Sequence, residues 1–216
     1  MVHKDLNRNL LVSFSGAQST GKTTLLKAIQ KAHPSGAIYV PEVTRRLKRD
    51  YGIMINEAGG DVTQLLICAD HLQNVVKYKA DEATIMPTIL DRCSLDGVVY
   101  TFWMYAMGLV SQDTLSAAVS TYDHTISDYA TIFYTDPLDV KLEDDGERSI
   151  DVSFRLRIIE IFNWIISGAP APTEWAGSDM FNKPLPSISK PSCPIVKLSG
   201  TVEERLETFY NTLNKL

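Results

Sequence analysis

The amino-acid sequence predicts an α/β domain in which a five-stranded parallel sheet lies between two layers of helices. Short apolar stretches typical of buried strands alternate with longer stretches whose apolar residues recur at helical spacing. The first of these strands is followed at once by a glycine-containing loop and then by a helix. Strands that alternate with helices join in parallel, because each helix returns the chain to the edge where the previous strand began. We therefore expect a three-layer α/β/α architecture.

The expected strands are short apolar runs bounded by turn-forming residues. Pro41 closes the second run. Pro87 can stand at the start of the third run but not inside it, because proline has no backbone N–H to donate within a sheet. The fourth run stops at Asp136-Pro137. The five strands are expected at residues 10–15, 37–40, 88–91, 130–134 and 195–198.

Helices are expected between these strands. The first begins near Gly21 and ends near His33-Pro34, since proline disfavours the helical conformation in the residue before it. Asp61 is expected to cap a long helix, and Thr201 the final one. One face of the long helix is apolar, which is typical of packing on a core, and holds Val62, Leu65, Leu66, Ala69, Leu72 and Val76. Other helices are expected at 95–107, 111–127 and about 158–166, with a charged turn or short helix at 42–50.

Length and composition suit one compact domain. The chain has 216 residues, of which 44% are hydrophobic and 22% are charged, and these fractions are ordinary for a soluble globular protein. A formal net charge of −5 gives the whole molecule no attraction for nucleic acid or an anionic membrane. We expect residues 1–216 to form a single domain, with a small lid near 138–157 and a proline-rich loop near 168–190 to which no chemistry is assigned.

The cysteines and the N-terminal residues indicate a cytoplasmic protein. Cys68, Cys93 and Cys193 are odd in number and widely spaced, which is typical of reduced, buried thiols rather than of disulfides or a metal site. The first residues lack the apolar core of a signal peptide, and no apolar run is long enough to span a bilayer.

The loop after the first strand matches a phosphate-binding pattern, G-x-x-x-x-G-K-[ST], with the sequence Gly16-Ala17-Gln18-Ser19-Thr20-Gly21-Lys22-Thr23. Its glycines can take backbone angles that let successive N–H groups surround a phosphate, and the helix that follows adds the positive end of its dipole. Lys22 is expected to reach the β- and γ-phosphates, and the Thr23 hydroxyl to ligate Mg²⁺. This P-loop, with the adjacent Thr24, predicts binding of a nucleoside triphosphate.

A second motif, Pro41-Glu42-Val43-Thr44-Arg45-Arg46, follows the second strand. There Glu42 could accept a proton from an attacking hydroxyl, and Arg45 or Arg46 could bind an anionic group of the substrate. The alternative is an ordinary solvated helix start, since helix electrostatics favour acids before bases. We prefer the functional interpretation, because active sites of such sheets lie beyond the carboxyl ends of the strands.

The third strand ends in Asp91-Arg92. An aspartate at this place can hold Mg²⁺ directly or through water, and the arginine beside it can steady the transferring group or bind the substrate. The alternative is an aspartate that does no more than end a strand. We expect Asp91 and Arg92 to belong to the active site.

A charged segment, Asp144-Asp145-Gly146-Glu147-Arg148-Ser149, lies between the fourth strand and the next helix. Phosphoryl transfer concentrates charge on the γ-phosphate, and enzymes neutralise it with arginine beneath a lid that excludes water. Arg148, with Arg155 or Arg157 behind it, is expected to supply this arginine. The alternative is a plain solvated loop.

Together these motifs resemble the P-loop kinases related to the nucleoside and nucleotide kinases. The likeness is greatest to the ribosylnicotinamide-kinase-like P-loop family of bacteria and their phages. It covers most of the chain and rests on the order G-x-x-x-x-G-K-T, Pro-Glu-Val with following arginines, Leu-Asp-Arg, and Asp-Gly-x-Arg.

The resemblance implies a sheet in the order 2-3-1-4-5, ATP as the phosphate donor and Mg²⁺ as the metal ion. It also implies that the protein acts in the cytoplasm of a bacterium or of a phage-infected host. By resemblance to deoxynucleoside kinases the catalytic base falls on Glu42, and the family's lid arginine falls on Arg148. The Asp-Arg pair at residues 91–92 resembles that of thymidylate kinases, although their fuller glycine-containing substrate motif is missing. The loop beside the adenine falls on Ser199, Gly200 and Thr201.

Other functions are weighed against this one. A GTPase switch would need an Asn-Lys-x-Asp motif, and Asn182-Lys183 is followed by Pro184-Leu185, so the acid is missing. A P-loop ATPase would hydrolyse ATP without any acceptor.

A phage-type kinase acting on hydroxymethylated bases in DNA would need a basic groove, for which the cluster of Arg45, Arg46, Lys48 and Arg49 is the candidate. We favour a small nucleoside or nucleotide as acceptor and predict no oligomeric state.

Overall fold

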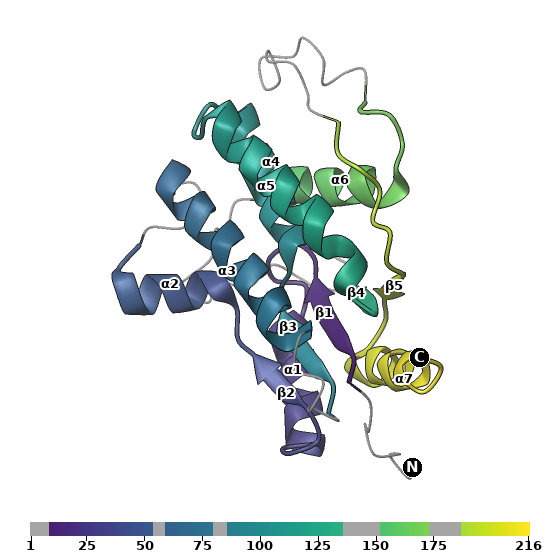
Figure 1. Ribbon diagram of the computed structural model, residues 1–216. Coiled ribbons are helices and arrows are strands. Elements are labelled where there is room, and N and C mark those ends of the chain that lie inside the picture. Colours follow the sequence, from purple (N-terminus) through teal and green to yellow (C-terminus); the bar gives the residue numbers. More distant parts are fainter. Residues whose placement is uncertain (1–8, 54–58, 80–85, 136–151, 173–186) are drawn as a thin grey trace.

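The computed structural model describes residues 9–53, 59–79, 86–135, 152–172 and 187–216. In this part of the chain five strands form one parallel sheet in the order β2-β3-β1-β4-β5 (Figure 1). The strand order implied by the resemblance to P-loop kinases is therefore confirmed. The strands are β1 (Leu11–Ser15), β2 (Ile38–Val40), β3 (Thr88–Asp91), β4 (Thr131–Thr135) and β5 (Ile195–Leu198).

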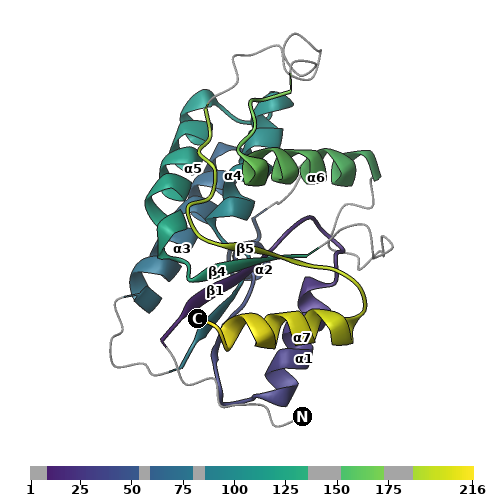
Figure 2. The ribbon, with the colours of Figure 1, turned by 90° about the vertical axis from the view of Figure 1, so that its right-hand side faces the viewer.

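Helices cover both faces of this sheet, so the expected three-layer architecture is confirmed. Figure 2 shows α1 (Lys22–Ala32) and α7 (Val202–Leu213) on one face and the larger helical layer on the other. A short helix, α2 (Val43–Tyr51), follows β2, and a 3₁₀ turn at Ile126–Asp128 follows α5. The larger layer consists of α3 (Asp61–Lys79), α4 (Ser94–Ala106), α5 (Gln112–Thr125) and α6 (Val152–Ser167).

The central strand β1 divides the core into two parts, because its side chains alternate between the faces. Val12 and Phe14 are fully buried against α1 and α7, where the Phe14 ring lies 5.3 Å from the Phe133 ring and 5.5 Å from the Phe209 ring. On the other face Leu11 belongs to the core formed with α4, α5 and α6. All five residues of β1 are buried, as expected for the middle strand of a parallel sheet.

The register of the sheet brings the carboxyl ends of the strands to one edge. Phe14 of β1 pairs with Asp91 of β3 and with Phe133 of β4. The loops that follow β1, β2 and β3 therefore meet at this edge, which is where such sheets carry their active sites.

The expected packing of the long helix α3 is wrong in two respects. Asp61 is its first residue rather than its cap, and Oδ1 of Asp61 accepts hydrogen bonds from the backbone N–H and hydroxyl of Ser111, at 2.7 and 3.0 Å. The apolar residues expected to pack on the core are exposed instead: Val62, Leu65, Leu66, Ala69, Leu72 and Val76. The buried face holds Thr63, Gln64, Ile67, Cys68, His71 and Val75. Three of these six residues are polar, and two of them, Gln64 and His71, line a pocket.

The three cysteines are free and buried. None of the helices in the described ranges combines the length and the apolar character that a membrane span requires. The expected lid lies outside the described residues up to position 151, and residues 152–157 form the start of α6. Residues 173–186 of the proline-rich segment lie outside them as well.

Candidate active site

The P-loop joins β1 to α1 and has the backbone that its glycines allow. Gly16 has φ +137° and Gly21 has φ +83°, conformations that L side chains rarely adopt. A Cβ atom at Gly16 would lie 2.7 Å from Oγ1 of Thr135, so the loop also approaches β4 too closely for any side chain there. The hydroxyls of Thr20 and Thr135 lie 2.6 Å apart and fix the loop on the sheet.

Lys22 points back into this loop. Its ammonium group donates hydrogen bonds to the carbonyl oxygens of Gly16 and Ala17, at 2.8 and 2.6 Å, and to the Thr20 hydroxyl at 3.2 Å. Burial, and then the charge of Arg92, lower the pKa of Lys22 below its ordinary value of 10.5. Lys22 is 2% exposed, so its ammonium group is buried within the P-loop.

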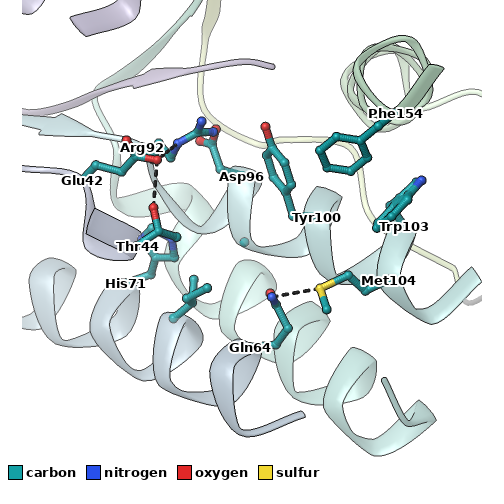
Figure 3. A pocket seen from close by; sticks show the side chains of 12 residues that line it. Glu42, Thr44, Gln64, His71, Arg92, Asp96, Tyr100, Trp103, Met104 and Phe154 are labelled. Carbon is teal, nitrogen blue, oxygen red and sulfur yellow. Dashed lines mark hydrogen bonds and ion pairs between the residues drawn. The ribbon is translucent and has the colours of Figure 1, made fainter. Parts of the chain in front are cut away.

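Arg92 is the centre of a buried polar network (Figure 3). Its Nε donates to Oε1 of Glu42 at 2.6 Å, and its Nη1 donates to Oδ1 of Asp96 at 2.8 Å and to the Gly16 carbonyl at 3.2 Å. The guanidinium carbon lies 5.2 Å from the centre of the Tyr100 ring. One side chain thus links the ends of β1, β2 and β3.

The turn after β3 explains this position. The N–H of Arg92 donates to the Phe14 carbonyl at 2.9 Å, which extends the pairing of β3 with β1 by one residue. Arg92 then takes φ +77°, which for a residue with a side chain costs about 1–3 kcal/mol. Cys93 caps α4, and the carboxylate of Asp96 accepts from the Cys93 N–H at 3.2 Å and from the Gly16 N–H at 3.3 Å. These charge-assisted bonds offset the strain.

Glu42 caps α2 at the end of β2 and is 6% exposed. Its oxygens also accept hydrogen bonds from the Thr44 hydroxyl at 2.9 Å and from Nε of Arg45 at 3.1 Å. Arg46 instead forms an ion pair with Asp70 of α3. Of the two arginines proposed for substrate binding, Arg45 therefore contacts Glu42, whereas Arg46 joins α2 to α3.

Asp91 has a carboxylate oxygen, Oδ1, that is buried without a hydrogen-bond partner among the described residues. Burial and the charge of Glu42 raise the pKa of Asp91, against the opposing effect of Arg92 and Lys22. A buried oxygen without a partner suits a ligand of Mg²⁺. No group of three or more His, Cys, Asp or Glu residues that could hold a metal ion occurs in the described ranges.

A pocket that is partly open to solvent adjoins this network, and its empty space, open solvent included, is about 510 Å³. Figure 3 shows Tyr100, Trp103 and Phe154 together on one side and Glu42, Arg92 and Asp96 on the other. The rings of Trp103 and Phe154 lie 4.5 Å apart, edge to face. The lining is formed by Glu42, Thr44, Gln64, Ile67, His71, Arg92, Asp96, Gly97, Tyr100, Trp103, Met104 and Phe154.

Two polar side chains of α3 line this pocket. Oε1 of Gln64 accepts from the Thr101 hydroxyl at 2.9 Å, which fixes the amide. Burial lowers the pKa of His71 to about 4, so the imidazole is neutral at pH 7. An aromatic wall with a few fixed polar groups is typical of a small-molecule site.

The P-loop is also held by arginines that come from distant parts of the sequence. Arg205 of α7 donates through Nη1 to the Thr20 carbonyl at 2.7 Å and through Nε to the Gly200 carbonyl at 3.0 Å. The segment Ser199-Gly200-Thr201 therefore lies beside the P-loop. Arg155 of α6 donates to the Ser19 carbonyl at 3.4 Å.

A sequence profile of a protein family described as "AAA domain" matches residues 11–173. The chain belongs to this family. No curated protein matches the sequence.

Solved structures similar to this AAA domain include two kinases and the NadR protein. Deoxyadenosine kinase from M. mycoides, with the products dCMP and dCDP, has a TM-score of 0.58 at 13% identity, over 96% of this chain and 100% of the other. Thymidylate kinase from Candida albicans has a TM-score of 0.60 at 15% identity, over 96% and 92%. NadR protein in complex with NR has a TM-score of 0.61 at 17% identity, over 95% of this chain and 50% of NadR. The fold of the P-loop nucleoside and nucleotide kinases is thereby confirmed.

The fold of this AAA domain brings most of the expected site residues together at one edge of the sheet. The P-loop, Glu42, Asp91 and Arg92 meet there. Arg157 does not, because it is exposed and pairs with Glu160 at 2.7 Å. Arg148 lies outside the described residues.

Several side chains of the site were not expected from the sequence. The sequence could have indicated a contact between Asp96 and Arg92, because Asp96 lies four residues after Arg92, in the first turn of a helix that follows a strand. Gln64 and His71 lie seven residues apart in α3, which places them on one face of the helix. Arg205 had no local signal. The others are the pocket residues Tyr100, Trp103, Met104 and Phe154.

Proposed function

We propose that this protein is an ATP-dependent kinase that transfers the γ-phosphate to a hydroxyl or phosphate of a small nucleoside- or nucleotide-like molecule. One observation carries the proposal: a pocket with an aromatic wall and fixed polar groups shares Glu42 and Arg92 with the network that contacts the P-loop. A donor phosphate held by the P-loop and an acceptor in this pocket would both lie against Arg92. A kinase requires this proximity of two binding sites.

The proposed chemistry assigns a role to each of these residues. The Glu42 carboxylate takes the proton of the acceptor hydroxyl, whose oxygen then attacks the γ-phosphorus, and the bond to the β–γ bridging oxygen breaks to release ADP. Lys22 and the P-loop amides hold the β- and γ-phosphates. Arg92, assisted by Arg155 and by Arg148, stabilises the charge on the transferring group.

Thr23, in the first turn of α1, and Asp91 are the residues that would hold Mg²⁺. Bound there, the ion would supply positive charge that offsets the negative charge of the donor phosphates. The loop at Ser199, Gly200 and Thr201 would contact the adenine, on the side of the P-loop that Arg205 fixes.

The pocket favours this function over the two alternatives. An ATPase without an acceptor has no need for an aromatic pocket beside Glu42. A DNA kinase would need free cations, yet three of the four candidates are paired with acids: Arg45 with Glu42, Arg46 with Asp70, and Arg49 with Asp50. Pairing removes most of the attraction that such a cluster would have for phosphates.

A coupled assay of ADP release tests the proposal. The screen uses ATP and Mg²⁺ with nucleosides, nucleoside monophosphates, ribosylnicotinamide, and plain or hydroxymethylated DNA as acceptors. We expect turnover with at least one small molecule. Turnover with DNA alone would replace the proposal by the DNA kinase, and acceptor-independent turnover would replace it by the ATPase.

Lys22→Ala supplies the control for catalysis in this screen. Removal of the cation beside the β- and γ-phosphates should lower the rate by ~10³-fold or more. Lys27→Ala changes an exposed lysine of the same helix and should leave the rate unchanged. Near-normal transfer by a folded Lys22→Ala protein would contradict the assignment.

A further inference from the structure

The outer face of α3 is an exposed apolar strip. Val62 is 71% exposed, Leu65 43%, Leu72 42% and Val76 61%, and Ala69 between them is exposed as well. The helix beside it, α5, exposes mainly polar residues: Gln112, Asp113, Ser116, Ser120, Asp123 and His124. Single exposed apolar residues are ordinary, whereas an aligned row of them on one helix indicates a partner.

The spacing of this strip is that of a helix-pairing seam. Its five residues, at 62, 65, 69, 72 and 76, alternate steps of three and four, which is the heptad pattern of helices that pack along their length. The order of side chains, Val-Leu-Ala-Leu-Val, also reads the same in both directions. The seam is therefore complementary to itself when one copy is reversed.

We propose that α3 pairs with α3 of a second copy of this chain, antiparallel, about a twofold axis beside Ala69. Leu65 packs against Leu72 of the partner subunit, and Val62 packs against Val76 of the partner subunit. The small side chains of Ala69 meet at the axis, where they let the two helices approach closely. Such an interface is isologous, because both copies contribute the same surface.

The charges at the two ends of α3 favour this direction of pairing. Asp61 lies at the start of the helix and Lys77 near its end, and both are exposed. The antiparallel arrangement brings Asp61 close to Lys77 of the partner subunit and opposes the two helix dipoles. A parallel pair would instead place like charges and like dipole ends together. The strip therefore fits a second copy of this chain in one orientation.

The pairing would support the pocket from behind. The face of α3 opposite the strip carries Gln64, Ile67 and His71, which line the pocket. Contact of its outer face with α3 of the partner subunit would hold α3, and with it these pocket side chains, in place. The interface follows from the exposure, spacing and charge of residues on α3 and does not depend on the proposed function.

Sedimentation velocity over about 1–100 µM protein tests the interface. We expect a wild-type dimer and at least a 100-fold higher dissociation constant for Leu65→Glu with Leu72→Glu. The double variant Leu65→Lys with Leu72→Glu should restore the dimer. In the antiparallel register residue 65 faces residue 72 of the partner subunit, so the dimer gains two Lys–Glu pairs. The control, Ser116→Glu with Ser120→Glu on α5, should remain dimeric. A monomeric wild type, a dimer indifferent to the double glutamate, or failure of the Lys–Glu variant to associate would overturn the proposal.

A cysteine cross-link gives an independent measurement should the charged variants misfold. Ala69→Cys places two thiols at the axis, and the three native cysteines are buried. Oxidation should give a disulfide-linked dimer with Ala69→Cys but not with Ser116→Cys. Equal cross-linking of the two variants would overturn the proposed axis.

Discussion

Nε of Arg92 lies 2.6 Å from Oε1 of Glu42, and both side chains are buried. The pair spans the gap between the ends of β2 and β3 and, through Nη1 of Arg92, reaches the Gly16 carbonyl in the P-loop. The residue proposed as base is thus held by the residue proposed to stabilise the transferring group. A change at either position acts on both partners, and variants of similar size are needed to separate their roles.

Glu42→Gln tests the base with little change of shape, since the amide oxygen can still accept from Arg92. We expect kcat to fall by about 10²- to 10⁴-fold with unchanged affinity for ATP, the usual effect of losing a general base. Steady-state kinetics with the acceptor found in the screen measures this. An increase of KM alone would make Glu42 a binding residue and would leave Asp91 as the candidate base. Glu160→Gln, at an exposed ion pair, is the matched control.

Asp96→Asn should destabilise the protein, because Asp96 accepts from Arg92, Gly16 and Cys93 at a buried position. Hydrogen bonds to a charged group contribute about 1.5–3 kcal/mol, and we expect a loss of that order in the free energy of unfolding. Urea denaturation measures it. Asp113→Asn, in the exposed first turn of α5, should change stability by less than about 0.5 kcal/mol. Equal effects of the two substitutions would refute a structural role for Asp96.

The pKa of Asp91, raised to about 6 from 3.8, makes the stability of the nucleotide-free protein depend on pH. The folded state binds this proton more tightly than the unfolded state. The contribution of Asp91 to stability is therefore fully present below pH 3.8 and is lost as the pH rises through about 6. Asp91→Asn does not undergo this loss, because asparagine does not titrate. The free energy of unfolding of Asp91→Asn relative to wild type should therefore increase as the pH rises from 3.8 to about 6.

His71 has the opposite effect in an overlapping window, since its lowered pKa adds stability that is lost as the pH falls through about 4. His71 is present in both the wild type and Asp91→Asn, so its effect cancels. The difference between their free energies of unfolding therefore reports on Asp91 alone. Chemical denaturation at several pH values measures this difference. A difference that stays constant from pH 4 to pH 6 would contradict the raised pKa.

Gly16→Ala should disable the P-loop by distorting it. The backbone at φ +137° is closed to alanine, and the new Cβ would lie 2.7 Å from Oγ1 of Thr135. We expect a loss of about 1–3 kcal/mol from the backbone alone and weaker binding of ATP in titration calorimetry. Gly60→Ala is the control, because its φ is ordinary and its Cβ meets no atom within 4 Å. Normal ATP binding by Gly16→Ala would show that the loop tolerates the strain.

Local patterns in the sequence were sufficient for the strands and the P-loop, because burial and turn chemistry are set by neighbouring residues. The orientation of α3 was predicted wrongly, since both of its faces carry apolar residues at helical spacing. Periodicity identifies such faces but not which of them meets the sheet. The contacts of Asp96 with Gly16 and of Arg205 with Thr20 join residues 80 and 185 positions apart. Only the folded sheet brings such residues together.

The bond from Arg205 to Thr20 has a consequence for synthesis on the ribosome. Thr20 of the P-loop is translated 185 positions before the guanidinium that fixes its carbonyl. At about 5–20 residues per second the nascent loop waits roughly ten seconds or more for this support. Until then an emerging chain exposes a phosphate-binding loop that is incompletely braced, and a nucleotide should gain affinity for it only after Arg205 has left the exit tunnel.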